Sequence, residues 1–201
     1  ADPESIEQMI REALDWRGRV DVLVNNAAFM GRAAYHGIDE LDLKNWERQI
    51  AVNLRAPFLT AKLLVPSMRE SGGGVIANIT SGAGIIAEYS VPGLAYGTTK
   101  AALNRMTTLL ARDVADDSIV VFALDPSYTR TELVVQTAET AGLDASDAHD
   151  TSVPANLLAD LVEADPSHTA GRVFHTVEGR GPIVMADGAS ERPKGTEIEL
   201  D

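Results

Sequence analysis

The chain has 201 residues, of which 45% are hydrophobic and 23% charged, and this composition excludes a disordered, fibrous or membrane-spanning protein. Its net charge of −13 argues against a nucleic-acid backbone or an anionic membrane surface as the main partner, because both are negatively charged. The absence of cysteine excludes disulfides, thiol nucleophiles and thiolate metal sites, and it fits a reducing cytoplasm, where we expect the protein to be located.

Hydrophobic periodicity and turn residues predict helices that alternate with strands. The first helix starts at the cap candidate Asp2 and at Pro3, and it runs to about Trp16. The β-branched residues 20–24 then predict a strand that helices cover on both faces, in the centre of a sheet. In chain order, the remaining expected elements are a helix over 42–71 loosened by two prolines, a strand over 75–80, a helix over 94–114, a strand over 118–124, short helices over 131–140 and 154–163, and a strand over 182–185.

This alternation predicts the α/β class: a doubly wound, mostly parallel, Rossmann-like sheet with helices on both faces. Such sheets bind ligands at the carboxyl ends of their strands. We therefore expect the chemistry to lie just after residues 24, 80 and 124, where polar residues follow the predicted strands. No linker divides the chain, so we expect a single domain over residues 1–201 with a loose polar tail over 190–201.

Four polar residues near these strand ends could carry acid/base chemistry. Tyr96 and Lys100 are four positions apart on a predicted helix, so both side chains lie on one face. There the ammonium can lower the pKa of the phenol from its usual value of about 10, as a general acid and base requires. Ser81 could hydrogen-bond the oxygen that Tyr96 protonates, and Asn53 could hold a water or a backbone carbonyl near Lys100.

Each of these residues also has a purely structural interpretation. A Tyr-x-x-x-Lys pair on its own is more often a surface pair, and a helical asparagine such as Asn53 more often satisfies its own neighbours. A serine such as Ser81 commonly caps a turn. Their occurrence together and in order is what favours the catalytic interpretation.

The motifs occur in the order of the short-chain dehydrogenase/reductase family, which the chain resembles over nearly its whole length. They are Asn25-Asn26-Ala27-Ala28, Asn53, Ser81, the Tyr96 to Lys100 pentad and the segment from Asp125 to Thr131. The resemblance implies that Tyr96 is the acid/base, that Ser81 orients the substrate and that Asn53 supports a proton relay. It also implies that Lys100 holds the nicotinamide ribose and tunes Tyr96.

The resemblance further implies an NAD or NADP site. The residues it assigns to that site are Asn25, Ala27, Tyr96, Lys100, Pro126, Ser127, Thr129 and Thr131, with carboxamide contacts from the Thr129 backbone and Thr131. Thr131 is equally a helix N-cap candidate. Ser127 stands where the family has glycine, and we expect this departure to alter the backbone beside the nicotinamide.

Members of the family begin with further βα units, on the order of 60 residues, that contain a glycine-rich pyrophosphate turn. The present 201 residues start at the helix that follows those units, so we expect an N-terminally incomplete Rossmann-like domain and a partial sequence of a longer enzyme. In the family's sheet order an earlier strand lies beside residues 20–24. Without that strand, residues 20–24 would form an open sheet edge.

The sequence therefore predicts an NAD(P)-dependent oxidoreductase that interconverts a small carbonyl compound and a secondary alcohol. The resemblance implies a homodimer or homotetramer, assembled through the helices over 42–71 and 94–114. The alternative is a non-catalytic remnant that cannot bind a dinucleotide and acts as an assembly partner. We expect no metal site, because the histidines are scattered without ligand spacing; they are His36, His149, His168 and His175.

Overall fold

The computed structural model describes residues 1–30, 38–86, 93–138, 144–177, 179, 183–185 and 196–197. The strands are β1 (Val22–Asn25), β2 (Gly74–Ile79), β3 (Ile119–Asp125), β4 (Val173–His175), β5 (Ile183–Val184) and β6 (Thr196–Glu197). The α-helices are α1 (Pro3–Arg17), α2 (Leu43–Ile50), α3 (Ala56–Glu70), α4 (Leu94–Asp113), α5 (Glu132–Thr137), α6 (Ser152–Glu163) and α7 (Pro166–Thr169). A π-helix, η1 (Ala51–Arg55), joins α2 to α3, and short 3-10 turns are η2 (Gly82–Gly84), η3 (Ala115–Asp117) and η5 (Ala145–Asp147).

The strands form one mostly parallel sheet in the order β1-β2-β3-β4-β5-β6. β1 to β4 run parallel to one another, whereas β5 and β6 add antiparallel. This arrangement confirms the predicted α/β class. Two short strands were not expected: β4, and β6, which lies within the tail over 190–201. Within that tail, Thr196 and Glu197 pair with β5.

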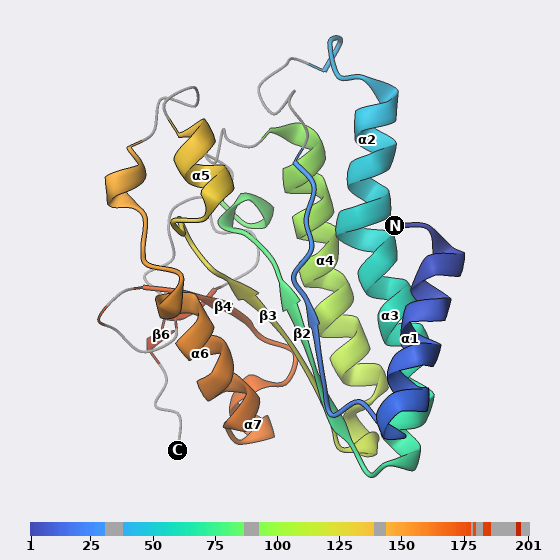
Figure 1. The fold of residues 1–201 in the computed structure, drawn as a ribbon. Coiled ribbons are helices and arrows are strands. Elements are labelled where there is room, and N and C mark those ends of the chain that lie inside the picture. Colours follow the sequence, from blue (N-terminus) through green and yellow to red (C-terminus); the bar gives the residue numbers. More distant parts are fainter. Residues whose placement is uncertain are drawn as a thin grey trace.

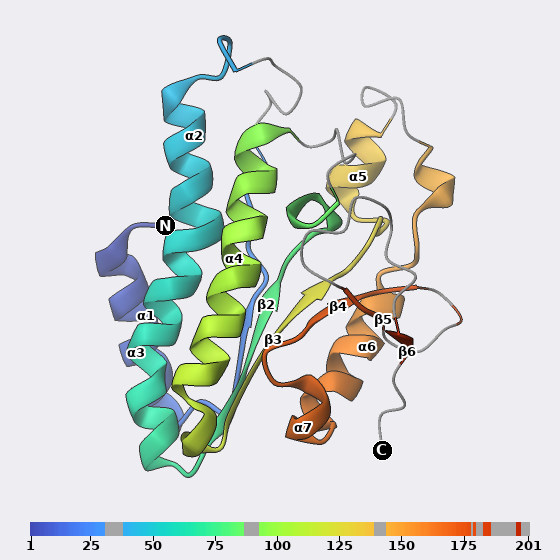
Figure 2. The ribbon, with the colours of Figure 1, turned by 180° about the vertical axis from the view of Figure 1, so that it is seen from behind.

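Helices cover both faces of the sheet, as Figures 1 and 2 show. On one face, α1, α3 and α4 pack against β2 and β3 around a cluster that includes Ile10, Leu64 and Ile76. On the other face, Leu161 of α6 belongs to a second cluster with Phe122 of β3. Burial on both faces explains why the strand sequences are continuously apolar rather than alternating.

β1 lies at the edge of the sheet that the described residues form. Its β-branched run alone predicted a central strand, whereas the sheet order of the family predicted an open edge for these residues. Leu23 packs against the first cluster, but Val22 and Val24 on the other face are each 40% exposed. The reason is that α6 packs over β2 and β3 and not over β1. A β-branched run indicates a strand, but it does not by itself show how many neighbours the strand has.

The predicted helix over 42–71 is continuous but contains a π-helical segment. The backbone N–H of Ala56 donates to the carbonyl of Ala51, five residues earlier. Pro57 has no N–H, so it cannot donate to the carbonyl of Asn53 four residues before it. Pro66 lies inside α3 without ending it. The π-helical segment contains Asn53, a residue predicted to be functional, and π-helical turns often occur at functional sites.

The turn η2 packs tightly on α4 through glycine. A Cβ placed on Gly84 would lie 2.6 Å from the backbone nitrogen of Ala101 and 2.6 Å from the carbonyl carbon of Lys100. Such a distance is too short for any side chain, so glycine is required if η2 is to stay against this helix.

We expect Gly84→Ala to lower the free energy of unfolding by about 1–3 kcal/mol, because the added methyl group must push η2 away from α4. Urea unfolding measures the change. Thr98→Ala, at an exposed position of α4, is the control and should change stability by less than about 0.5 kcal/mol. An unchanged stability of Gly84→Ala would show that η2 does not pack on α4 as described.

Candidate active site

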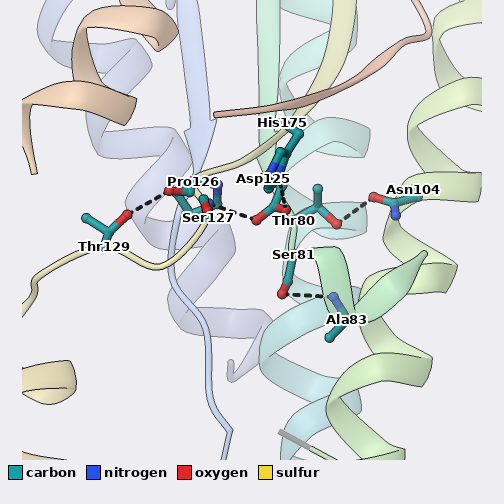
Figure 3. Close-up of polar contacts among 9 residues, drawn as sticks. All are labelled: Thr80, Ser81, Ala83, Asn104, Asp125, Pro126, Ser127, Thr129 and His175. Atoms are coloured by element: carbon teal, nitrogen blue, oxygen red, sulfur yellow. Dashed lines mark hydrogen bonds and ion pairs between the residues drawn. The ribbon is translucent and has the colours of Figure 1, made fainter. Parts of the chain in front are cut away.

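The residues predicted to be functional lie around the carboxyl ends of β1, β2 and β3. Asn25 ends β1, Ser81 follows β2 by two residues and Pro126 directly follows β3. Figure 3 shows Ser81 and the Pro126 turn at neighbouring strand ends. The amino-terminal half of α4, which carries Tyr96 and Lys100, packs against η2 and β3. The topology thus collects segments that are up to about a hundred residues apart in sequence at one end of the sheet.

Lys100 is a buried cation. Its side chain is among the largest that are fully buried, and the residue is only 2% exposed. Its ammonium donates a hydrogen bond of 2.7 Å to the carbonyl oxygen of Ile79, near the end of β2. Burial lowers the pKa of Lys100 from 10.5 to about 8, against an opposing effect of the negative charge on Asp125. The amine is therefore mostly protonated at neutral pH but close to losing its proton.

Tyr96 lies one helical turn before Lys100 and is itself 9% exposed. The Lys100 ammonium nitrogen is 5.4 Å from the centre of the Tyr96 ring. Because both residues are buried, they do not form the surface pair that a Tyr-x-x-x-Lys motif usually represents. The ammonium thus lies against the aromatic ring, within the range of a cation–π contact.

Asn53 joins the segment after β1 to α4. Its Oδ1 accepts from the backbone N–H of Phe29 at 2.7 Å, and its Nδ2 donates to the Phe29 carbonyl at 2.9 Å. The same Nδ2 donates to Oγ1 of Thr99 at 3.1 Å. Thr99 directly precedes Lys100, so the Asn53 side chain ties the segment after β1 to the turn of α4 that carries the lysine.

Asn25 belongs to a buried polar network under the site. Its Nδ2 donates to Oδ1 of Asn78 at 2.8 Å, and its Oδ1 accepts from the hydroxyl of Thr60 at 2.8 Å. Asn78 in turn donates to Oγ1 of Thr107 at 2.9 Å. The network ties β1, β2, α3 and α4 together. The Asn25 side chain is thus already engaged within the fold, whereas Ala27 is exposed.

Ser81 caps the turn that follows β2. Its Oγ accepts from the backbone N–H of Ala83 at 3.2 Å (Figure 3), which is the structural interpretation suggested by its sequence. The capping bond uses Oγ only as an acceptor, so the hydroxyl hydrogen remains available for a substrate oxygen. The two interpretations of Ser81 are therefore compatible.

The loop after β3 has a left-handed residue at Ser127, with φ of 58°. A glycine adopts this conformation most easily, so the serine keeps a backbone shape typical of the glycine that it replaces. Thr129 donates through its hydroxyl to the Pro126 carbonyl at 2.7 Å. The Thr131 hydroxyl accepts from the backbone N–H of Val134 at 3.3 Å and so caps α5, which confirms its alternative as an N-cap.

One buried pair at this site was not predicted from the sequence. Nδ1 of His175 on β4 lies 2.7 Å from Oδ2 of Asp125 at the end of β3. The sequence carried only a weak signal for it: an acid directly after an apolar strand. His175 could not be matched to it because β4 is three residues long and was not predicted.

Within the ranges given above, no cluster of three His, Asp or Glu side chains is arranged to hold a metal ion. None of the helices described is long and apolar enough to cross a membrane.

Comparisons with known proteins identify the family of the chain. Residues 1–142 match the family described as short chain dehydrogenase. An uncharacterized oxidoreductase of Thermotoga maritima is 39% identical over 127 residues, which are 63% of this chain and 48% of that protein. The chain spans about half the length of the curated relatives that it matches.

Two solved structures resemble the chain over most of its length. Acetoin dehydrogenase from Enterobacter cloacae is 29% identical with a TM-score of 0.70, over 84% of this chain and 67% of that one. A 3-ketoacyl-(acyl-carrier-protein) reductase from Brucella melitensis, solved as a complex with NADH, is 25% identical with a TM-score of 0.74, over 87% of this chain and 72% of that one.

The buried charge on Lys100 predicts a pH-dependent gain of stability in Lys100→Met. Above pH 8 the folded protein releases the Lys100 proton, whereas the unfolded chain keeps it up to about 10.5. At pH 7 the desolvation of the charged amine therefore lowers the free energy of unfolding of the wild type. As the pH increases from 8 to 10.5, the folded state loses this charge and the free energy of unfolding rises. Lys100→Met should be more stable than wild type by about 1–3 kcal/mol at pH 7, and the difference should shrink towards pH 10.

Urea unfolding of both proteins across this pH range measures the difference. Lys62→Met, at an exposed position of α3, is the matched control and should show no such trend. A destabilised Lys100→Met at pH 7 would mean that the ammonium is not desolvated as its burial indicates.

Proposed function

The chain belongs to the short-chain dehydrogenase family, and we propose that its site interconverts a small carbonyl compound and a secondary alcohol with NAD or NADP. The observation that carries the proposal is the buried Lys100 ammonium beside the ring of Tyr96. Burying a charge costs free energy, and a fold that needs only packing at this position would use an apolar side chain. A functional role explains the free-energy cost of burying this charge, if the charge acts on the neighbouring Tyr96.

The residues present fit the nicotinamide end of such a cofactor. An ammonium has three donors, and Lys100 uses one on the Ile79 carbonyl, which leaves two for ribose hydroxyls. The Pro126 loop and Thr131 lie at the neighbouring strand end, where the carboxamide would bind. When bound, the nicotinamide gives or takes a hydride. The similar reductase structure with NADH supports this class of cofactor.

The chain's own residues would handle the proton. In the reducing direction, Tyr96 donates its hydroxyl proton to the carbonyl oxygen of the substrate while the ammonium of Lys100 stabilises the phenolate that remains. The Ser81 hydroxyl donates a hydrogen bond to the same oxygen and so fixes its position. In the oxidising direction the phenolate takes the proton of the alcohol. Asn53 keeps the Phe29 backbone against Thr99, and we assign it to the proton relay by which Tyr96 is reprotonated.

We place the substrate above Ser81 and Tyr96, and the homo-oligomer contact on the α2–α3 and α4 faces. Phe58 of α3 is 49% exposed, which supports an apolar contact on this face. A cytoplasmic location, from the lack of cysteine, belongs to the same proposal.

Tyr96→Phe is expected to lower the turnover rate by about 100-fold to 10,000-fold, because it removes the only hydroxyl of this residue while keeping the ring that packs beside Lys100. The assay follows the loss of NADH or NADPH absorbance with a panel of small ketones and aldehydes. Fluorescence titration should show that the variant binds NADH within about threefold of wild type. Equal turnover by the two proteins would remove Tyr96 from the mechanism, and no turnover of any compound by wild type would favour the assembly-partner alternative.

Lys100→Arg is expected to change the pH dependence of cofactor binding. In wild type the dissociation constant for NADH should rise as the pH increases through about 8, since the ammonium that holds the ribose loses its charge. Arginine stays protonated throughout, so the variant should bind with a constant affinity between pH 7 and about pH 10. A rise of the same size in both proteins would assign the transition to another group.

A further inference from the structure

Both carboxylate oxygens and the backbone carbonyl of Asp125, the last residue of β3, accept hydrogen bonds within the site. Its Oδ2 accepts from Nδ1 of His175 at 2.7 Å, and its Oδ1 accepts from the backbone N–H of Ser127 at 3.0 Å (Figure 3). Its backbone carbonyl accepts from the N–H of Thr176 at 3.0 Å. Asp125 and His175 are 2% and 8% exposed and face each other in the β3–β4 register. The carboxylate is therefore fixed from both sides.

One of these bonds acts on a strained residue. Ser127 has φ of 58°, and a residue with a Cβ spends about 1 kcal/mol or more to adopt the left-handed region. The bond from the Ser127 N–H to the Asp125 side chain closes a turn of the Asx type, which compensates for this cost. A bond to an ionised acceptor is stronger than one between neutral groups.

We propose that Asp125, held in place by His175, is a positioning residue that keeps the Pro126–Ser127 turn in the shape that binds the nicotinamide end of the cofactor. The inference rests on the proposed function, since it assigns a role in the same site. It goes beyond that function because neither Asp125 nor His175 belongs to the four residues that handle the proton.

The same carboxylate also acts on the buried cation. The titratable groups that face Lys100 within the part of the chain described are Tyr96 from its own helix α4 and Asp125 from β3, which favours the charged form of the lysine. His175 lies behind Asp125 and contacts the carboxylate. Asp125 thus connects the backbone of the cofactor turn to the charge of Lys100, and removing it should change both.

The first test is a double-mutant cycle on cofactor binding, measured by fluorescence titration with NADH. Asp125→Ala in the wild-type background should raise the dissociation constant about tenfold, as loss of a charge-assisted hydrogen bond would. In a Ser127→Gly background the same substitution should raise the dissociation constant for NADH about threefold or less, because glycine holds a positive φ without the bond. A merely structural role of Asp125 would give the same loss in both backgrounds, and that result would overturn the proposal.

The second test needs no cofactor. The chain has four lysines, Lys44, Lys62, Lys100 and Lys194, so NMR of protein labelled at the lysine Cε can follow each one, with Lys100 assigned by its absence in Lys100→Arg. Asp125→Asn keeps an acceptor for Ser127 but removes the charge, and it should lower the titration midpoint of Lys100 by about half a unit or more. Thermal melting checks that each variant folds.

The two tests separate the inference from the function on which it rests. If wild type does not bind NADH, the proposed function fails, while the Lys100 midpoint still decides whether Asp125 acts on the lysine. If wild type binds NADH, the cycle decides whether Asp125 holds the turn. An unchanged Lys100 midpoint in Asp125→Asn would show that the carboxylate does not act on the lysine, whereas an equal loss of NADH affinity in both backgrounds of the cycle would overturn its role in the turn.

Discussion

The burial of the Lys100 ammonium is the constraint on which the rest of the site depends. A cation that is 2% exposed cannot be left without partners, because the lost hydration is worth several kcal/mol. The fold supplies a carbonyl oxygen from β2 and the face of an aromatic ring from α4, and the negative charge of Asp125 at the end of β3 favours the charged amine. None of these groups could be in place unless the parallel strands ended together beneath the start of α4. The arrangement of the strand ends and α4 therefore determines the electrostatic surroundings of the ammonium.

Helix α4 connects this cation to the remaining functional groups. Tyr96, Thr99 and Lys100 lie in its first two turns, and Asn53 reaches Thr99 from the π-helix. Lower in the helix, Thr107 is bonded to Asn78, which continues to Asn25 at the end of β1. Because these hydrogen bonds hold α4 to the π-helix and to β2, the helix cannot shift along its axis without breaking several of them at once. Such a scaffold is suited to hold an acid/base group still while a hydride moves, which is the chemistry of the family to which the chain belongs.

Much of this arrangement could be predicted from the sequence. The β-branched runs, the glycine turns and the Tyr96 to Lys100 spacing indicated the sheet, the main helices and the polar residues at the strand ends. What could not be predicted depends on tertiary contacts. Val22 and Val24 suggested a central strand, but their exposure follows from where α6 packs. The two prolines predicted only a loosened helix, and they did not indicate the π-helix over Ala51–Arg55. The pairing of Asp125 with His175 spans 50 residues, and nothing local marks it. Ser127 departs from the family's glycine, and only its φ shows that the turn keeps a glycine-like shape.

The most direct test of the account is the titration of Lys100 in the unliganded wild-type protein, followed by the NMR shift of its labelled Cε. If the ammonium is buried beside the ring of Tyr96, its midpoint lies at about pH 8, well below the usual value of about 10.4 for an exposed lysine. A Lys100 midpoint equal to that of the exposed lysines would contradict the account, because the cation would then be hydrated and the tyrosine would have no charge to tune it.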